Sequence, residues 1–324
     1  MGCSLNGTTE TDYYTPATSD VYANDCDILH APAAGFCDTN TYLLILVNSH
    51  HDNEHLRNAA RKTWTTLSNQ NKPKFLANFT IPKFNIVFMF GRHVNRTKNE
   101  NIVREHILHG DIIQVNFNES YHNLTLKSLA GLKWANANCP SSLRYVMKTD
   151  DDSFVNVAIL AQKLQQLKSN RAMIGICLKS KVQRGSASKK WAVSCADFPF
   201  KQFPQYLAGH GYVISADLVK ELILLSKRQR RIHIEDAYIT GILRRVAGNV
   251  TLECNKGFSH AYRKSPNTWD FPSKGVTHTV GSAWEMHAIW RYYMIFEPPV
   301  TQNERTLSPA PAAPRTTNQL PVYH

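Results

Sequence analysis

The chain carries short continuous apolar runs, separated by stretches whose apolar residues recur at helical spacing. The runs 42–47 and 85–90 contain no polar alternation, so they predict strands that are buried on both faces, as in a parallel sheet. Between them, the apolar residues of segment 56–63 recur three and four positions apart, which predicts an amphipathic helix. The first part of the chain therefore has a strand–helix–strand pattern.

The same alternation continues towards the C-terminus. Further helical and strand patterns lie in turn at 100–108, 111–115, 123–134, 145–147, 157–167, 173–177 and 218–225. Asn123 stands where it can cap the helix that follows it. Strands that alternate with helices predict an α/β layered domain over residues 40–296.

Three segments lack this periodicity. Residues 1–39 predict an irregular, stem-like segment, and the Pro-, Ala- and Thr-rich residues 297–324 predict a disordered tail. Residues 189–215 are rich in aromatics, Pro and Gly. Within them, Gly209 and Gly211 allow a ligand to approach the backbone closely. No third glycine completes a dinucleotide-binding fingerprint, which argues against a Rossmann cofactor site.

The formal charge of +12 makes an anionic partner plausible. The densest basic cluster, residues 227–231, follows the helical pattern at 218–225, and we interpret it as a solvated helix end because cations suit the C-terminal dipole. No zinc-finger spacing or aromatic RNA-binding signature accompanies it. We therefore expect no nucleic-acid partner.

Cysteine and sequon content point to a lumenal compartment. Seven cysteines include no C-x-x-C pair, which argues against a structural zinc site, and their odd number leaves at least one thiol free or paired between chains. Six N-x-[ST] sequons favour a glycosylated protein with disulfides. No apolar run reaches 18 residues and no signal-peptide pattern opens the chain. We therefore expect an N-terminal anchor encoded upstream of Met1.

Three consecutive carboxylates, Asp150, Asp151 and Asp152, follow the strand pattern at 145–147 directly. In extended backbone Asp150 and Asp152 point to one side and Asp151 to the other. Two hard carboxylates at a strand end suit Mg²⁺ or Mn²⁺, and ligands of open α/β sheets bind at the carboxyl ends of strands. The alternative is a solvated acidic turn.

Several blocks occur in a fixed order along the chain. They are RNAARKTW (57–64), FMFG (88–91), FNESYHNLTLK (117–127), KTDDDSFVN (148–156), KW (190–191), IEDAY (234–238) and EMHAIW (285–290). In these blocks the chain resembles the β-1,3-glycosyltransferase family of inverting enzymes, also called the galactosyltransferase family. The resemblance implies a GT-A fold, in which a Rossmann-like nucleotide-binding half with a mixed central sheet joins an acceptor-binding half.

The resemblance also implies a UDP-sugar donor, Mn²⁺ and inversion at the anomeric carbon. Asp150 and Asp152 are then metal ligands, and His278 is a further candidate ligand. A divalent ion offsets the charge that grows on the diphosphate leaving group. Inversion in one displacement needs a base on the acceptor side, and Asp236 matches that position. Its neighbour Glu235 faces elsewhere; the alternative for both is an acidic helix N-terminus.

Donor binding is the role we assign to Asp150, Asp151, Arg57 and Arg61, although both arginines equally suit a role in buttressing the sheet. The implied reaction moves galactose from UDP-galactose to a GalNAc- or GlcNAc-terminated glycan in β-1,3 linkage, in the Golgi lumen. The runner-up is a β-1,3-N-acetylglucosaminyltransferase that uses UDP-GlcNAc. An inactive glycan-binding or chaperone-like relative is the alternative from another class, and the intact carboxylates argue against it.

Overall fold

The computed structural model describes residues 9–22, 26–167, 170–185, 189–259 and 271–297. Apart from residue 297, the predicted tail lies outside the described residues. No helix in the described part of the chain is long and apolar enough to cross a bilayer.

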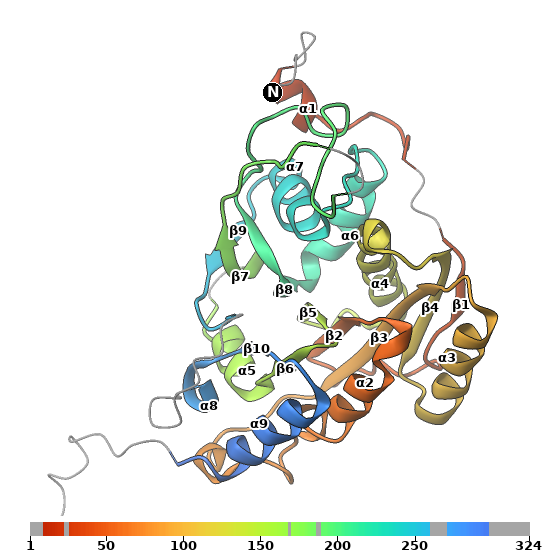
Figure 1. Ribbon diagram of the computed structural model, residues 1–324. Helices are drawn as coiled ribbons and strands as arrows, with labels where there is room; N and C mark the ends of the chain where they lie inside the picture. Colours follow the sequence, from red (N-terminus) through yellow and green to blue (C-terminus); the bar gives the residue numbers. More distant parts are fainter. Residues whose placement is uncertain (1–8, 23–25, 168–169, 186–188, 260–270, 298–324) are drawn as a thin grey trace, which may run out of the picture.

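An eight-stranded mixed sheet forms the centre of the molecule, in the order β1-β4-β3-β2-β5-β8-β7-β9 (Figure 1). Its strands are β1 (Ile28–His30), β2 (Leu43–Asn48), β3 (Phe84–Arg92), β4 (Ile112–Asn118), β5 (Tyr145–Asp150), β7 (Ala172–Leu178), β8 (Tyr206–Ser215) and β9 (Thr251–Cys254). Strands β4, β3, β2 and β5 run parallel. Strand β8 is antiparallel to both of its neighbours, β5 and β7. This confirms the predicted α/β fold with a mixed sheet.

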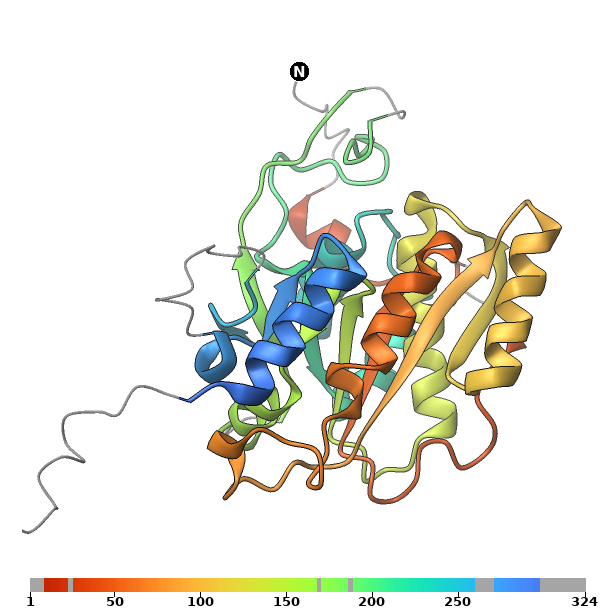
Figure 2. The ribbon, with the colours of Figure 1, turned by 60° about the horizontal axis from the view of Figure 1, so that its bottom comes forward.

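The parallel strands are buried on both faces because helices cover each face. Leu44 and Leu46 of β2 belong to a core cluster with helices α4 and α6. Leu43, Ile45 and Val47 of the same strand belong to a second cluster, with helices α2, α3, α5 and α9. The continuous apolar run that predicted this strand thus reflects two cores, one on each side of the sheet. Helices α2 and α9 lie side by side on the second face (Figure 2).

Helices cover both faces of the sheet, and all but α9 agree with the sequence patterns. They are α2 (Glu54–Arg61), α3 (Arg96–His109), α4 (Leu124–Asn138), α5 (Val157–Gln165), α6 (Ala216–Ser226) and α9 (Ala283–Ile295). The shorter elements are α1 (Glu10–Tyr14), α7 (Arg244–Ala247), α8 (Phe271–Lys274), η1 (His51–Asn53), η2 (Trp64–Thr66), η3 (Lys74–Leu76), η4 (Tyr121–Asn123), the π-helical η5 (Ala237–Leu243), β6 (Ser153–Val155) and β10 (Thr277–Thr279). The predicted cap of α4 is wrong, because the Asn123 side chain donates to the Asn118 carbonyl (2.8 Å) instead.

Strand β8 is the strand next to β5 that the sequence patterns did not predict, and strands β1, β6, β9 and β10 were not predicted either. The β8 segment contains Gly209 and Gly211, which weaken any strand pattern. Both glycines admit a close approach of protein side chains, and the approach of a ligand stays a prediction. A Cβ at position 209 would lie 3.1 Å from an Asp236 carboxylate oxygen, and one at 211 would lie 3.0 Å from a Thr277 methyl group. The glycines therefore bring β8 against the segments that carry the candidate site.

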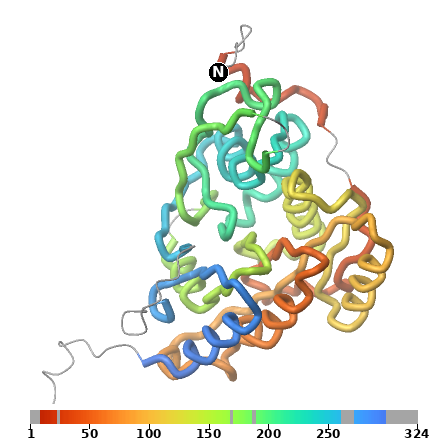
Figure 3. Tube along the Cα trace, viewed as in Figure 1, coloured from red at the N-terminus to blue at the C-terminus, as the bar shows by residue number. Residues whose placement is uncertain are grey.

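The N-terminal segment takes part in the fold, although an irregular stem was predicted there. Strand β1 pairs with β4 at one edge of the sheet, and a disulfide joins Cys37 to Cys139. Residues 9–22 lie against 194–200 and the end of α6, where Tyr13 donates to the Asp197 carbonyl (3.0 Å). Figure 3 shows this segment in red beside the green and cyan parts. The boundary at residue 39 stays a prediction.

The same segment covers part of the basic cluster that we expected to be a solvated helix end. Helix α6 does end at Ser226, directly before the cluster. However, the backbone of residues 17–22 donates to the carbonyls of Lys227 and Arg228, and the Arg228 side chain donates to Asp20 (3.1 Å). The interpretation of a fully solvated end is therefore wrong for these two residues.

A buried ion network joins α2 to α3 and the start of β4. Arg57, with 1% of its side chain exposed, donates to Glu105 (2.7 Å), and Arg61 donates to Glu105 (2.7 Å) and to Asp111 (2.8 Å). Burial by itself would raise the pKa of Glu105, but the hydrogen bonds and charges of the two arginines outweigh burial and lower it.

We expect Glu105→Gln to destabilise the protein by about 3–5 kcal/mol, because it leaves the buried Arg57 charge without its partner. The free energy of unfolding from urea titration measures this loss. Glu100→Gln is the matched control, since the Arg96–Glu100 pair is exposed and such pairs contribute at most about 0.5 kcal/mol. Because the folded pKa of Glu105 is lowered, its contribution is present above the unfolded pKa and is lost as pH falls through the folded one. Equal losses in the two variants would contradict the prediction.

Candidate active site

The carboxylate triplet lies at the carboxyl end of β5, in the turn that leads to β6. Asp150 is the last residue of β5. The Asp151 amide donates to the Asn48 carbonyl at the end of β2 (3.1 Å), and the Val280 amide donates to the Asp152 carbonyl (2.7 Å). The turn is thus held between β2 and the segment after β10, at the edge of the sheet where α/β proteins bind ligands.

A buried lysine, Lys148, connects Asp150 to the acidic pair Glu235–Asp236. Lys148 precedes Asp150 by two positions on β5, so both side chains point to the same side. Its ammonium lies 2.7 Å from an Asp150 oxygen and 3.7 Å from a Glu235 oxygen, and it donates to the Gly209 carbonyl. Burial disfavours the charge, but the Asp150 and Glu235 carboxylates outweigh burial and raise the pKa of Lys148.

Asp151 points away from this group, into the loop after β2. Its two oxygens accept hydrogen bonds from the Ser49 hydroxyl (2.6 Å), the His50 amide (3.1 Å) and the Asn53 side chain (3.0 and 3.1 Å). Only 8% of Asp151 is exposed. These contacts make Asp151 an anchor of the loop, and its assignment to donor binding stays a prediction.

Asp152 has the electrostatics of a cation site. Burial, followed by the charges of Asp150 and Asp151, raises its pKa to about 6. Three neighbouring carboxylates held so close repel one another, and a bound cation would relieve that repulsion. The carboxylates of Asp150 and Asp152 are ligands of the kind that Mn²⁺ or Mg²⁺ takes, and metal binding by them stays a prediction.

His278 lies on β10, which pairs with β6 directly after the triplet; His278 stands opposite Phe154, and Thr279 opposite Ser153. The side chain is 2% exposed and its ring centroid lies 5.5 Å from that of Phe271. Burial lowers the pKa of His278, against the opposing charge of Glu285, so the ring is neutral at pH 7, as a metal ligand must be. Among the described residues, however, no three His, Cys, Asp or Glu side chains are grouped to hold a metal. The metal role of His278 stays a prediction.

Asp236 lies at the start of η5 and accepts a hydrogen bond from the Ala237 amide (2.8 Å). Burial, followed by the charge of Glu235, raises its pKa to about 6. That value suits a general base near neutral pH, and π-helical segments such as η5 occur frequently at functional sites. The titratable groups that interact with its carboxylate are Glu235, Lys148, Tyr121, Tyr206 and Tyr212.

Glu235 has a different environment from its neighbour. It is 6% exposed and accepts a hydrogen bond from the Tyr212 hydroxyl, beside the Lys148 ammonium. Burial raises the pKa of Glu235, and the Lys148 charge opposes this rise. The expectation that Glu235 faces elsewhere than Asp236 agrees with these contacts, because Glu235 faces the buried lysine while Asp236 lines a cavity.

Comparison with known proteins identifies the family of this chain. The family model described as "Galactosyltransferase" matches residues 55–252. The chain belongs to the galactosyltransferase family. It is 32% identical over 238 residues to human beta-1,3-galactosyltransferase 5, covering 72% of each chain. It is also 32% identical over 258 residues to mouse beta-1,3-galactosyltransferase 1, covering 78% of this chain and 74% of that protein.

Among solved structures, the galactosyltransferase LgtC in complex with donor and acceptor sugar analogs aligns with 82% of this chain and 99% of its own. The sequence identity is 9% and the TM-score 0.37, so this similarity carries no argument about the site. The family match shows that the chain is a UDP-sugar glycosyltransferase. The triplet, Lys148 and Asp236 all lie within the matched residues. His278 lies beyond them.

This galactosyltransferase has a cavity of about 300 Å³ beside Asp236. The residues that line it are Tyr121, Ser180, Lys181, Gln183, Trp191, Phe203, Tyr206, Ile234 and Asp236. Trp191 is 51% exposed and donates from its indole nitrogen to the Tyr121 hydroxyl (3.0 Å). An exposed, fixed aromatic ring beside a carboxylate of raised pKa can hold the apolar face of a sugar while a hydroxyl meets the carboxylate.

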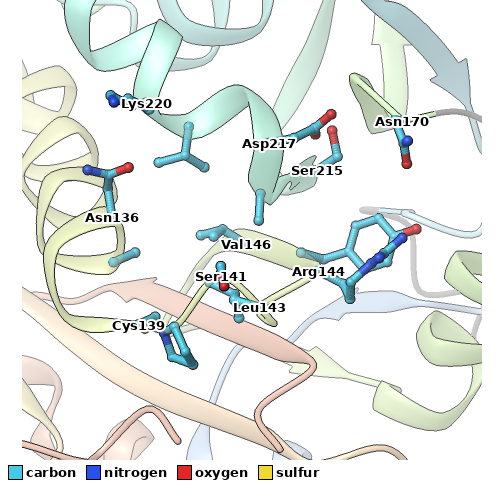
Figure 4. A pocket seen from close by; sticks show the side chains of 15 residues that line it. Asn136, Cys139, Ser141, Leu143, Arg144, Val146, Asn170, Ser215, Asp217 and Lys220 are labelled. Carbon is cyan, nitrogen blue, oxygen red and sulfur yellow. The ribbon is translucent and has the colours of Figure 1, made fainter. Parts of the chain in front are cut away.

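A larger cavity, of about 500 Å³, lies elsewhere, between the end of α4 and the start of α6 (Figure 4). It includes Tyr145 at the start of β5, whereas Asp150 ends that strand, roughly 17 Å further along at the usual rise of a strand. The larger cavity is therefore at the opposite end of the sheet from the triplet and is not part of the candidate active site.

The guanidinium groups of Arg57 and Arg61 donate to other residues and do not point free donors at this site. Arg57 donates to Glu105, to the Ser49 hydroxyl (3.1 Å) and to the His50 carbonyl (2.8 Å), and Arg61 is engaged by Glu105 and Asp111. Their contacts support the structural alternative that we considered from the sequence. Arg57 contacts the loop that Asp151 also anchors, and the donor-binding role of both arginines stays a prediction.

Lys148 and Lys127 are the site residues that sequence reasoning missed. Lys127 is 2% exposed, pairs with Glu119 (2.7 Å) and donates to the Ser49 carbonyl (2.9 Å). Each lysine stands inside an otherwise apolar segment, and this pattern could have predicted a buried ion pair, because a lysine is almost never fully buried unless it is paired. The sequence does not say with which carboxylate it pairs.

Proposed function

We propose that this chain transfers galactose from UDP-galactose, with inversion, to a GalNAc- or GlcNAc-terminated glycan in β-1,3 linkage. The observation that carries the proposal is Asp236: a carboxylate of raised pKa that opens onto an aromatic cavity and is joined through Glu235 and Lys148 to the carboxylate triplet. The similarity to beta-1,3-galactosyltransferases 5 and 1 supports the sugar and the linkage.

The carboxylate triplet 150–152 and the pair Glu235–Asp236 have different roles in the proposed reaction. On the triplet side, Asp150 and Asp152 would hold a divalent ion such as Mn²⁺, which supplies Lewis-acid stabilisation of the departing diphosphate. On the cavity side, Trp191 and Tyr121 orient the acceptor sugar, and Asp236 takes the proton from the attacking hydroxyl. Lys148 holds Asp150 and the Glu235–Asp236 segment in a fixed relative position, so that the base stays aligned with the donor.

We propose the Golgi lumen as the compartment in which this protein works. The disulfides Cys37–Cys139 and Cys177–Cys254 indicate an oxidising compartment. The sequon asparagines Asn78, Asn95, Asn118 and Asn249 are exposed, as glycosylation requires. Asn123 is less suited, because its side-chain nitrogen already donates to the Asn118 carbonyl.

The test is a panel of UDP-sugars and simple acceptors, with and without Mn²⁺, in which UDP release and product linkage are measured. We expect UDP-galactose with a GalNAc or GlcNAc acceptor to yield a β-1,3 product only when the metal is present. Preference for UDP-GlcNAc would establish the N-acetylglucosaminyltransferase instead. Glycan binding without any transfer would establish the inactive relative.

We expect kcat/KM to fall about tenfold per pH unit below about pH 6, because Asp236 must be deprotonated to act as a base and its pKa is raised to about 6. The measurement is a pH–rate profile at saturating Mn²⁺, which prevents protonation of Asp152 from limiting the rate. The residual activity of Asp236→Asn should lack this acidic limb. If the variant keeps the limb, another group is responsible for it.

A further inference from the structure

The cavity beside Asp236 has a cationic rim. Lys181 lines the cavity, and the Lys190 ammonium lies 4.4 Å from the ring centroid of Tyr121 and 5.5 Å from that of Trp191. Lys201 and Lys189 belong to segments paired with this wall, since their carbonyls accept from the Val182 and Ala192 amides. All four lysines are exposed.

The rim lacks a matching set of carboxylates. Segment 179–201 contains five lysines and Arg184 but a single acidic residue, Asp197. Asp197 accepts from the Ser194 hydroxyl (2.6 Å) and lies 3.8 Å from Arg230. Within the part of the chain that the structure describes, none of the four rim lysines forms an ion pair with a carboxylate. Arg184 differs from them, because it donates to three backbone carbonyls and so holds the loop together.

These charges are placed where the acceptor enters. Trp191 and Tyr121 line the same cavity as Asp236, and the Lys190 ammonium lies over both rings, so a sugar on the aromatic rings would lie close to this lysine. Unpaired cations around a concave site attract anions and raise their local concentration. A solvated surface without a partner is the simpler alternative, but it does not account for exposed lysines without carboxylate partners both in the cavity lining (Lys181) and over its aromatic rings (Lys190).

We propose that the acceptor of this enzyme is an anionic glycan, which carries a carboxylate or sulfate group on the sugar next to the one that receives galactose. The inference rests on the proposed function, because it concerns the acceptor side of the same site. It adds the charge class of the acceptor, which the family match does not provide.

Matched acceptors test the proposal. They share one neutral disaccharide core and differ only in an added sulfate, an added carboxylate or neither, and kcat/KM is measured at low and at physiological salt. We expect the anionic acceptors to be preferred several-fold at low salt, through KM rather than kcat, with the preference shrinking as salt screens exposed charges. Comparison of the sulfated with the carboxylated core identifies the group. Equal kcat/KM for neutral and anionic cores at low salt would overturn the proposal.

Lysine variants locate the effect. Lys181→Gln and Lys190→Gln should each reduce the preference for the anionic core about two- to fivefold, the effect of one exposed charge pair. Lys190→Arg should keep the preference, which separates lost charge from lost packing on Tyr121. Lys220→Gln is the matched control: this exposed lysine lines the cavity at the opposite end of the sheet, and its removal should leave the preference unchanged. An equal loss in Lys220→Gln would show that net charge alone is responsible.

Failure of the proposed function gives a different result from failure of this inference. If no core receives sugar from any UDP-sugar, the proposed function fails. Calorimetric binding of the sulfated, carboxylated and neutral cores to the wild-type enzyme then still decides whether the rim selects anions. If neutral cores are glycosylated and bound as well as anionic ones, the function stands and the inference fails.

Discussion

Asp236→Asn should lower turnover by about 10²–10⁴-fold, the usual contribution of a positioned general base. The change keeps the shape of the side chain and leaves an oxygen to accept from the Ala237 amide, but it removes the basic lone pair. Affinity for the UDP-sugar should barely change, because that side of the site depends on Asp150 and Asp152. Single-turnover rates and donor affinities measure the two effects separately.

Glu235→Gln is the informative companion to this variant. Glu235 is buried against Lys148 and the Tyr212 hydroxyl, so its replacement should weaken the alignment of the segment and the stability of the fold more than the chemical step. We therefore expect a milder loss of turnover than in Asp236→Asn. A near wild-type rate for Asp236→Asn, or a lower rate for Glu235→Gln, would show that the base is assigned wrongly.

Asp152→Ala should abolish metal-dependent transfer, by at least about 10³-fold, since a bound divalent ion contributes several kcal/mol to stabilising the departing charge. The fold should survive, because burial and the charges of Asp150 and Asp151 already disfavour ionised Asp152 and its removal relieves that repulsion. Calorimetric Mn²⁺ titration should show weakened binding, while the thermal midpoint stays level or rises.

Asp20→Ala is the matched control for this variant, because Asp20 is half exposed and pairs with the partly exposed Arg228. It should change neither Mn²⁺ binding nor turnover. Normal Mn²⁺-dependent turnover in Asp152→Ala would remove the triplet from the mechanism.

The sequence predicted the elements that local pattern controls. The continuous apolar runs at β2 and β3 predicted strands buried on both faces, and the two clusters of core residues confirm this. Strand β8 was missed because Gly209 and Gly211 interrupt its apolar pattern. The absence of a side chain lets Gly209 lie against Asp236 and Gly211 against Thr277. Such contacts join residues that are far apart in the chain, so the spacing of apolar residues along the sequence does not predict them.

For the site, the sequence by itself determined which residue types were available and how neighbours along a strand divide: Asp150 to one side, Asp151 to the other. Only the tertiary structure decided the partners. It directed Asp151 to the loop after β2, engaged Arg57 and Arg61 with Glu105, and placed Lys148 between Asp150 and Glu235. The physical reason is that a carboxylate or a cation has no preferred partner until strand pairing and helix packing bring one within about 4 Å and exclude water from around it.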